Sequence, residues 1–244
     1  MPQRTTALAQ VMPAPKPHNN TSSPSLASAS DNANGIDAAE LLPDLSRVAT
    51  VRAVLRPVHP DGHASRRGAA RGAVEAGARR MNEASGTLWP VARATGAGWV
   101  AMHMQGGPTD MQADPHYDDV FAEVRDFLHE RAAAATAAGV AEVWIDPGFG
   151  FGKTVAPNMT LMARLTEFCA GPYPVLAGMS RKSTLGALTP DPDGSVPGPT
   201  DRLEASIAAT VWAATKGVSM VRVHDVAATV AAVRIVCDEV PVSS

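Results

Sequence analysis

The sequence has 244 residues, a formal net charge of −3 and 45% hydrophobic residues. This balance predicts one soluble domain with a buried core, and it argues against nucleic acid as the main partner. No apolar run approaches the ~18 residues of a membrane span, so no membrane partner is expected. Cys169 and Cys237 match no metal or redox spacing. Together with the lack of a secretion-signal pattern, they favour a cytoplasmic protein with reduced thiols.

The first 37 residues differ in composition from the rest of the chain. They are rich in Pro, Ser and Asn and show no apolar periodicity, so we predict that residues 1–37 lack stable structure. Residues 38–244 are predicted to form the folded domain. The domain begins with a helical pattern of leucines and valines from Ala38, which Pro57 ends, and an alanine-rich helix follows over residues 67–76.

Five strand-then-helix units come next. Largely apolar segments that stop at polar residues predict strands over residues 98–103, 143–146, 174–180 and 219–224, and a short strand that ends in a polar loop is predicted over residues 79–82. Helical periodicity predicts helices over residues 90–97, 118–138, 159–170, 201–216 and from 225 onward. Asn158 is predicted to N-cap the third of these helices, and Asp201 with Glu204 to open the fourth as a capping box.

Strict alternation of strand and helix predicts an α/β fold with a parallel sheet and right-handed crossovers. We expect a TIM (β/α)8-type barrel that is incomplete, with five clear C-terminal βα units. An open, doubly wound sheet is the structural alternative. Polar residues stand where the predicted strands end, and in a barrel those ends share one rim: Asn82, His103, Asp146, Ser180, Arg222 and His224.

The stretch from Asp146 to Thr154 organises the chain. The apolar run 143–145 stops at Asp146, three alternating glycines follow, and Lys153 closes the loop. An acid where a parallel strand ends, followed by a glycine-rich loop, is the usual place of an α/β active site. A plain βα turn with a helix cap is the alternative. The spacing does not match a Walker A loop.

The rim residues predict a ligand that is flat, polar and phosphorylated. Asn82 and Asp146 together offer donors and acceptors for the edge of a heterocycle, and Lys182 adds a cation. Arg222 and His224 alternate on one strand and share a face, and arginine suits both phosphates and flat rings. Taken singly, Asn82 could be a turn residue, Lys182 a helix cap, and Arg222 with His224 a surface pair.

Five motifs in order resemble the dihydropteroate synthases, over about residues 67–240. They are residues 81–86 (Met-Asn-Glu-Ala-Ser-Gly), 102–106 (Met-His-Met-Gln-Gly), 146–154 (Asp-Pro-Gly-Phe-Gly-Phe-Gly-Lys-Thr), 180–183 (Ser-Arg-Lys-Ser) and 222–226 (Arg-Val-His-Asp-Val). The resemblance implies a TIM barrel that joins 4-aminobenzoate to 6-hydroxymethyl-7,8-dihydropterin diphosphate. The products would be 7,8-dihydropteroate and pyrophosphate, in folate biosynthesis. It also implies Mg²⁺ as cofactor and a homodimer formed through the last helices.

By the same resemblance each motif position takes a role. The pterin edges would be held by Asn82, Asp146 and Lys182, in a pocket lined by Met102, Phe151 and Gly178. Arg222 would stack on the pterin and, with His224, hold the diphosphate. The aminobenzoate would lie beside Ser180, Phe151 and Lys182. The catalytic roles would fall to Lys182, Arg222 and His224.

The first third of the chain departs from the family pattern. The family's Asn-Val-Thr-Pro-Asp-Ser-Phe loop, which would help hold Mg²⁺ and the diphosphate, has only a faint counterpart in residues 20–25, so the metal ligands stay unknown. Residues 62–67 lack the Asp-Thr expected after a third strand, and Glu83 replaces an expected Asp. We therefore expect impaired turnover. The alternatives are a non-catalytic or degraded paralogue that keeps a pterin-binding surface, and a pterin-dependent methyl transferase barrel.

Overall fold

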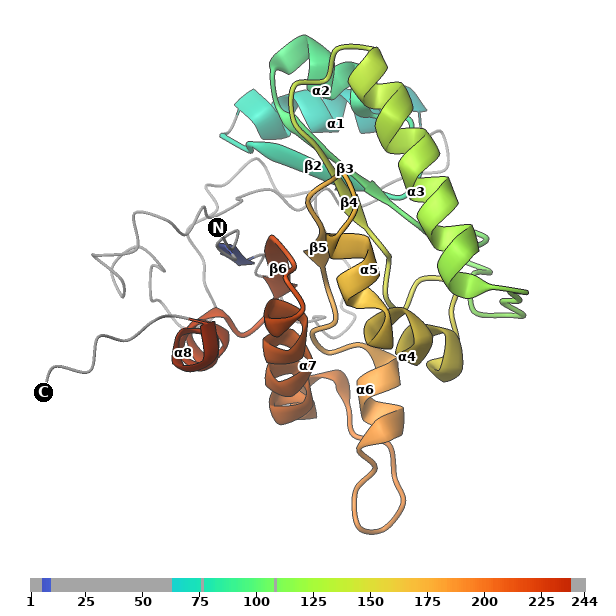
Figure 1. Ribbon diagram of the computed structural model, residues 1–244, viewed down its shortest axis with the longest axis vertical. Coiled ribbons are helices and arrows are strands. Elements are labelled where there is room, and N and C mark those ends of the chain that lie inside the picture. Colours follow the sequence, from blue (N-terminus) through green and yellow to red (C-terminus); the bar gives the residue numbers. More distant parts are fainter. Residues whose placement is uncertain (1–5, 10–62, 76, 108, 238–244) are drawn as a thin grey trace, which may run out of the picture.

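The computed structural model describes residues 6–9, 63–75, 77–107 and 109–237. Its strands are β1 Thr6–Ala9, β2 Arg80–Glu83, β3 Gly98–Met102, β4 Val143–Asp146, β5 Leu176–Ala177 and β6 Met220–Val223. Every strand pair is parallel. The two sheets, β2-β3-β4 and β1-β6-β5, meet where Ile145 bridges Val175 beside the end of β4 (Figure 1).

This order supports a barrel rather than the doubly wound alternative. From β2 to β6 each strand lies next to its successor in the chain, and β1 pairs with β6, so the first described strand lies beside the last. A doubly wound sheet would instead reverse its strand order at a switch point. The described strands therefore form part of a TIM-type barrel, and they fit the incomplete barrel that the sequence predicts.

The helices alternate with the strands and lie outside them. They are α1 His63–Glu75, α2 Trp89–Thr95, α3 Val120–Ala137, α4 Val155–Ala163, α5 Leu165–Cys169, α6 Ser183–Leu188, α7 Leu203–Thr215 and α8 Val226–Cys237, with a 3-10 turn at Pro199–Asp201. In Figure 1, α3 runs along β3 and β4, and α7 lies beside β6. Within the described ranges, no helix has both the length and the apolar composition that crossing a bilayer requires.

Two apolar layers lie on opposite faces of the strands. The outer layer, between strands and helices, contains fully buried side chains such as Trp99, Leu128, Ile145, Leu161 and Phe168. A separate cluster alternates with it along the strands and consists of Val100, Trp144, Leu176 and Met220. Because successive side chains of a strand point to opposite faces, this second cluster is the interior layer of the barrel.

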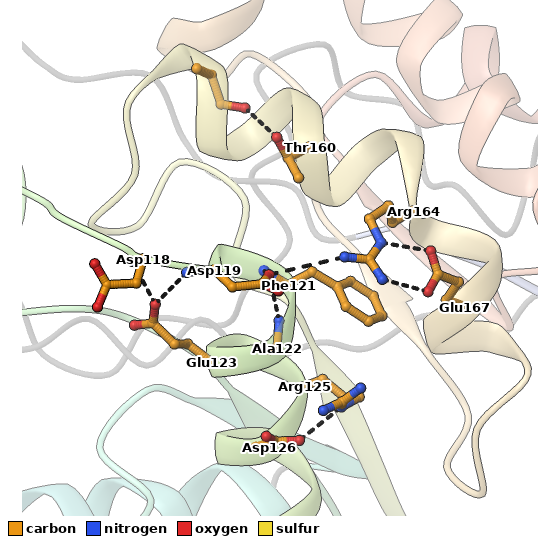
Figure 2. Close-up of polar contacts among 11 residues, drawn as sticks. Asp118, Asp119, Phe121, Ala122, Glu123, Arg125, Asp126, Thr160, Arg164 and Glu167 are labelled. Carbon is orange, nitrogen blue, oxygen red and sulfur yellow. Dashed lines mark hydrogen bonds and ion pairs between the residues drawn. The ribbon is translucent and has the colours of Figure 1, made fainter.

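A set of polar contacts fastens α3 to the segment that follows β4 (Figure 2). Asp119 caps α3, because its side chain accepts hydrogen bonds from the backbone N–H groups of Phe121 and Ala122, both at 3.0 Å. Arg164, between α4 and α5, forms a bidentate pair with Glu167, and its guanidinium lies 3.7 Å from the centre of the Phe121 ring. These contacts hold α5 against the start of α3.

The structure corrects the predicted boundaries after β4. Helix α4 begins at Val155, so Asn158 is not an N-cap but a buried residue inside the helix. Proline is tolerated in a first helical turn, so Pro157 is compatible with a helix that begins at Val155. The predicted capping box is also wrong, because Arg202 precedes α7 and no side chain caps that helix.

Two further predictions differ from the structure. The strand expected over residues 174–180 is reduced to Leu176–Ala177, and α6, which follows it, was not predicted. Residues 1–37 were expected to lack structure, yet Thr6–Ala9 pairs with β6 from Thr6–Met220 to Ala9–Val223. Pairing with an open strand edge can override an unfavourable composition. The helix predicted from Ala38 and the domain boundary at residue 37 lie outside the described residues.

Candidate active site

The predicted site residues form the layer of the barrel directly above its apolar interior. Four of the residues in this layer stand two positions after an interior residue and so share its face, while Asn82 is paired in register with the interior residue Val100 and reaches the layer through its hydrogen bond to Asp146. Met102 follows Val100 in this way and is paired in register with Asp146. The layer lies at the carboxyl ends of the strands, where TIM barrels have their active sites, and consists of Asn82, Met102, Asp146, Gly178 and Arg222.

Asp146 is the centre of this layer. Its side chain is fully buried, and one carboxylate oxygen accepts a hydrogen bond from Asn82 Nδ2 at 3.0 Å. The other oxygen accepts from the backbone N–H of Gly148 at 2.8 Å. Arg222 Nη1 lies 3.5 Å from the oxygen that Asn82 contacts. A buried carboxylate needs such partners, and each oxygen still keeps one lone-pair direction for a ligand.

Gly178 and Arg222 fit together because Gly178 has no side chain. A Cβ atom at residue 178 would lie 2.7 Å from Arg222 Nη2 and 3.1 Å from its Cζ, too close for a real contact. The planar guanidinium thus lies directly against the backbone of Gly178. Its partial burial and its contact with Asp146 hold a flat cation at the edge of the site.

Lys182 supplies a second cation. Its Nζ lies 3.7 Å from the centre of the Phe151 ring, so the loop after β4 and the loop after β5 meet in a cation–π contact. Burial, with the positive charge of Arg222 next in size, lowers the pKa of Lys182 to about 8, and the negative charge of Asp146 opposes both effects. Lys182 is therefore mostly protonated at neutral pH, and three charged side chains of the predicted set influence one another.

Ser180 and His224 form the last pair of the set. Ser180 Oγ accepts a hydrogen bond from the backbone N–H of His224 at 3.2 Å and lies 3.0 Å from Nδ1 of its ring. Burial, with the positive charge of Arg181 next in size, lowers the pKa of His224 below its ordinary value. The ring is then neutral at pH 7. Because Nδ1 faces the Ser180 hydroxyl, the other ring nitrogen, Nε2, is left for a ligand.

The glycine-rich loop is closed by a buried clasp. Gly148 has a φ of 68°, and a Cβ there would overlap the carbonyl oxygen of His103, so the loop packs on the chain after β3. Lys153, only 2% exposed, donates to His103 Nδ1 at 2.9 Å, to the Gly148 carbonyl at 3.0 Å and to the Phe151 carbonyl at 3.1 Å. Lys153 thus fixes the backbone of Phe151.

These contacts give a structural role to His103 and Lys153, to which the sequence assigned none. Burial, with the charge of Lys153 next in size, lowers the pKa of His103 to about 3, and burial lowers the pKa of Lys153 to about 7. A neutral His103 ring accepts from Lys153, and its edge packs against Phe127 at a centroid distance of 4.8 Å. His103 is therefore a hydrogen-bonded core residue, although it stands at a strand end.

Sequence reasoning missed the part that Asn158 plays in this site. Its Oδ1 accepts from the Gly150 N–H at 2.8 Å, while Nδ2 donates to the Thr154 carbonyl at 2.8 Å and to Thr184 Oγ1 at 2.9 Å. One side chain thereby joins the glycine-rich loop, α4 and α6. The signal available in the sequence, an Asn before an apolar helix, indicated a cap instead.

Glu83, which departs from the family pattern, has a structural role here. One carboxylate oxygen accepts from the Leu88 N–H at 3.0 Å and from Trp99 Nε1 at 3.1 Å, and the other contacts the Ser85 hydroxyl. These bonds hold the loop between β2 and α2 and the fully buried Trp99. The residue after Asn82 anchors this loop rather than facing the site.

The described residues do not fit a divalent metal ion. Across residues 67–237, apart from positions 76 and 108, no three His, Cys, Asp or Glu side chains group as metal ligands would. Asp146 already binds Asn82, Gly148 and Arg222. A small hollow beside Lys182 is lined mainly by apolar side chains such as Met162, Met179 and Leu185, and it offers no ligand set either.

Comparison with known proteins assigns this geometry to a family. A family model described as pterin binding enzyme matches residues 37–224. The chain is 46% identical to the dihydropteroate synthase of Stenotrophomonas maltophilia, whose structure superposes with a TM-score of 0.66 over 80% of this chain and 71% of that one. The chain belongs to the dihydropteroate synthase family of pterin-binding enzymes.

Two other dihydropteroate synthases match this chain over a similar part of its length. The dihydropteroate synthase of Thermus thermophilus is 41% identical, with a TM-score of 0.64 over 69% of this chain and 66% of the other. The Escherichia coli K12 enzyme is 49% identical over 144 residues, which are 58% of this chain and 49% of the relative. The chain thus spans about half the length of the curated relatives it matches.

Proposed function

We propose that this chain binds 6-hydroxymethyl-7,8-dihydropterin diphosphate and 4-aminobenzoate and condenses them to 7,8-dihydropteroate and pyrophosphate. The observation that carries this proposal is the buried Asp146 carboxylate, which accepts a hydrogen bond from Asn82, lies 3.5 Å from the guanidinium of Arg222 and has lone-pair directions left for a ligand. A carboxylate so placed reads N–H donors on the edge of a ring. The Thermus thermophilus relative was crystallised with 4-aminobenzoate, which supports the second substrate.

The pterin end of the site follows from this carboxylate. Asp146 accepts from the amino and ring N–H groups of the pterin, and Asn82, which already donates to Asp146, has its amide oxygen left to accept. The guanidinium of Arg222, which lies on the backbone of Gly178, offers a flat face for stacking on the ring. Met102, nearly buried beside Asp146, supplies apolar lining.

The other end of the site carries the charge that a diphosphate needs. Arg222 and Lys182 are cations, and the neutral His224 has a donor at Nε2. As the leaving group separates, negative charge builds up on it, and donors already held in place stabilise that charge without rearrangement. These three side chains therefore act on the departing pyrophosphate.

The reaction itself needs no protein nucleophile. The amine nitrogen of 4-aminobenzoate attacks the methylene carbon of the pterin, so a C–N bond forms while the C–O bond to the diphosphate breaks. The electron pair of that bond leaves with pyrophosphate, and the amine loses one proton to pyrophosphate or water. Phe151, held from below by Lys153 and from the side by Lys182, forms the wall beside which the aminobenzoate ring lies, with Ser180 nearby.

Two alternative functions are separated by measurement. A non-catalytic pterin-binding protein would bind the pterin without turnover, and the departures in the first third of the chain favour it. A pterin-dependent methyl transferase would not release pyrophosphate, and the three relatives reported above, all dihydropteroate synthases, argue against it.

The test compares ligand binding and turnover in the same protein. Calorimetry with 6-hydroxymethylpterin and a pyrophosphate-release assay would be run on the wild type, on Lys182→Met and on Lys216→Met. Lys216 is the matched control, because its Nζ lies 4.0 Å from the Trp212 ring, away from the site, in the same type of contact. We expect Lys182→Met to lower the turnover about 10²–10³-fold and Lys216→Met to leave it unchanged. No pterin binding by the wild type would overturn the proposal.

We also propose that the protein is a cytoplasmic homodimer, and that its turnover lies below that of the Thermus thermophilus relative. Large apolar side chains are exposed on the last two helices, with Trp212 43%, Ile235 79% and Val236 51% accessible, which supports a subunit contact there. Burial raises the pKa of the Cys169 thiol to about 11, as suits an unreactive reduced cysteine. That Mg²⁺ accompanies the diphosphate stays a prediction. A monomeric mass by light scattering would contradict the dimer.

A further inference from the structure

Arg181, between the site residues Ser180 and Lys182, has a strained backbone. Its φ is 58°, and among the described residues other than glycine it alone has a positive φ. Side chains rarely adopt this conformation, and where they do, the surrounding structure has to hold it. The strain lies in the short segment that leads from β5 to α6, and it sets the direction in which Lys182 leaves the sheet.

Both backbone groups of Arg181 are held by the start of α7. Its N–H donates to Ser206 Oγ at 2.9 Å, and its carbonyl accepts from Arg202 Nη1 at 2.9 Å. Arg202 is 8% exposed and is itself held by the carbonyl of Pro197 at 2.9 Å. The unfavourable conformation is therefore fixed by a buried, fully bonded frame.

The side chain of Arg181 reaches the other loop of the site. Its guanidinium forms a bidentate pair with Asp225, with Nη2 at 2.6 Å from Oδ1 and Nε at 3.1 Å from Oδ2. Asp225 follows His224 directly and precedes α8. Paired forks of this type fix distance and orientation together. The two loops, 44 residues apart in the chain, are thereby joined beside the site.

We propose that Arg181 and Asp225 are a positioning pair, which sets Ser180 and Lys182 against His224 so that these side chains converge on the diphosphate. This inference rests on the proposed function, since it names what the site holds. Neither residue was given a role by the sequence, although both lie within motifs that carry the family resemblance. In the proposal neither one touches the substrate, and each acts through the neighbours it places.

The presence of Asp225 is the sharpest sign of this role. A carboxylate beside an anion site repels the ligand, so a pure charge effect predicts that neutralising Asp225 strengthens anion binding. Positioning predicts the opposite, because Asp225→Asn breaks the fork that aligns the two loops. The direction of one change in affinity therefore separates the two explanations.

The experiment measures binding of inorganic pyrophosphate to the full chain by calorimetry. We expect Asp225→Asn and Arg181→Gln each to weaken binding about tenfold, the size of one lost charge-assisted hydrogen bond. Arg181→Lys keeps the charge but not the fork, and it should weaken binding by part of that amount. Asp126→Asn, which breaks an exposed Arg–Asp pair on α3 (Figure 2), is the matched control and should leave the affinity unchanged. Unchanged or tighter binding in Asp225→Asn would overturn the proposal.

A second readout does not depend on ligand binding. The charges that face His224 are Arg181, Asp225, Lys182 and Arg222. By NMR titration of the His224 ring, assigned with His224→Gln, we expect its pKa to rise in Arg181→Gln and to fall in Asp225→Asn. It should stay near the wild-type value in Arg181→Lys.

The two readouts separate failure of the pair from failure of the proposed function. If the wild type binds no pyrophosphate while the His224 titration shifts in these opposite directions, the proposed function fails and the pair stands. If neither substitution moves the titration, the two loops are not joined in solution and the inference fails. If Arg181→Gln or Asp225→Asn does not fold, the milder variant Arg181→Lys still tests the inference, because its pyrophosphate affinity should fall by part of the tenfold loss.

Discussion

Replacing Asp146 should separate the two ends of the proposed site. The carboxylate is fully buried, and two of its roughly four lone-pair directions are used by Asn82 and Gly148, which leaves about two for a pterin. Each charge-assisted hydrogen bond lost in Asp146→Ala costs ~1.5–3 kcal/mol. Losing even one of them lowers the affinity by about one to two decades.

Pyrophosphate should respond differently from the pterin ring. Removing Asp146 takes away the acid nearest to Arg222 and leaves the cations that would hold a diphosphate. It also removes the charge that raises the pKa of Lys182, so the comparison is made at pH 6.5, below the pKa of about 8, where that side chain stays protonated. We expect pterin affinity to fall at least tenfold while pyrophosphate affinity is kept or improves.

Calorimetry with 6-hydroxymethylpterin and with pyrophosphate checks both expectations. Asp146→Asn keeps the shape without the charge, and Asp193→Ala removes an exposed carboxylate in the loop before α7 as a control. Equal pterin affinity in the wild type and in Asp146→Ala would refute the assignment of the ring site. An equal loss of affinity for both ligands would show that Asp146 supports the fold and does not bind the pterin ring.

Three further predictions concern the framework around the site. Gly148→Ala should lower the free energy of unfolding by more than Gly194→Ala. Both glycines have a positive φ, at which a side chain costs ~1–2 kcal/mol. Of these two positions, only Gly148 lies so close to a backbone carbonyl that the new Cβ atom would overlap it. Thermal unfolding of the pair measures the difference, and equal losses would contradict the close loop contact. The free energy of unfolding should rise with pH between about 7 and 10.5, because in this range Lys153 is protonated in the unfolded chain and deprotonated in the folded one. In denaturant titrations at several pH values, Lys153→Met should flatten this rise. An unchanged rise would rule out a low pKa for Lys153. Asp119→Ala should cost ~1 kcal/mol through loss of the α3 cap, about 2–4 °C in melting temperature, while Asp118→Ala, with a side chain 99% exposed, should change little.

The strands with clear apolar runs could be predicted from the sequence alone. Residues 98–103, 143–146 and 219–224 each lie within one or two residues of an observed strand, as does the short, less apolar strand predicted over residues 79–82. Strands buried on both faces are continuous apolar runs that end at polar residues, so their position is a local property. Because side chains alternate along a strand, the same runs also fixed which polar residues share a face: Asn82, Asp146 and Arg222 are in direct contact.

The remainder depended on contacts that local patterns do not contain. Asn158 was interpreted as a cap because an Asn stood before apolar residues, yet its partners lie on the loop after β4 and on α6, as far as residue 184. The strand expected over residues 174–180 ends where Arg222 crosses Gly178. Arg181 carries its strain because of α7 and Asp225, which no pattern around residue 181 reveals.

The charged side chains of the candidate site influence one another through Asp146. Asp146 influences both Lys153 and Lys182 and raises their pKa values against the lowering caused by burial. One buried acid therefore acts on Lys153, which closes the glycine-rich loop, and on Lys182, which contacts the Phe151 ring. Asp146 and the clasp of His103 and Lys153 belong to β3, β4 and their loops, and Arg222 to β6. Every member of this charge network lies on strands β2 to β6 or on the loops after them. Since the described contacts of the network come from these strands and loops, we expect ring recognition to survive changes in residues 10–62 better than turnover does.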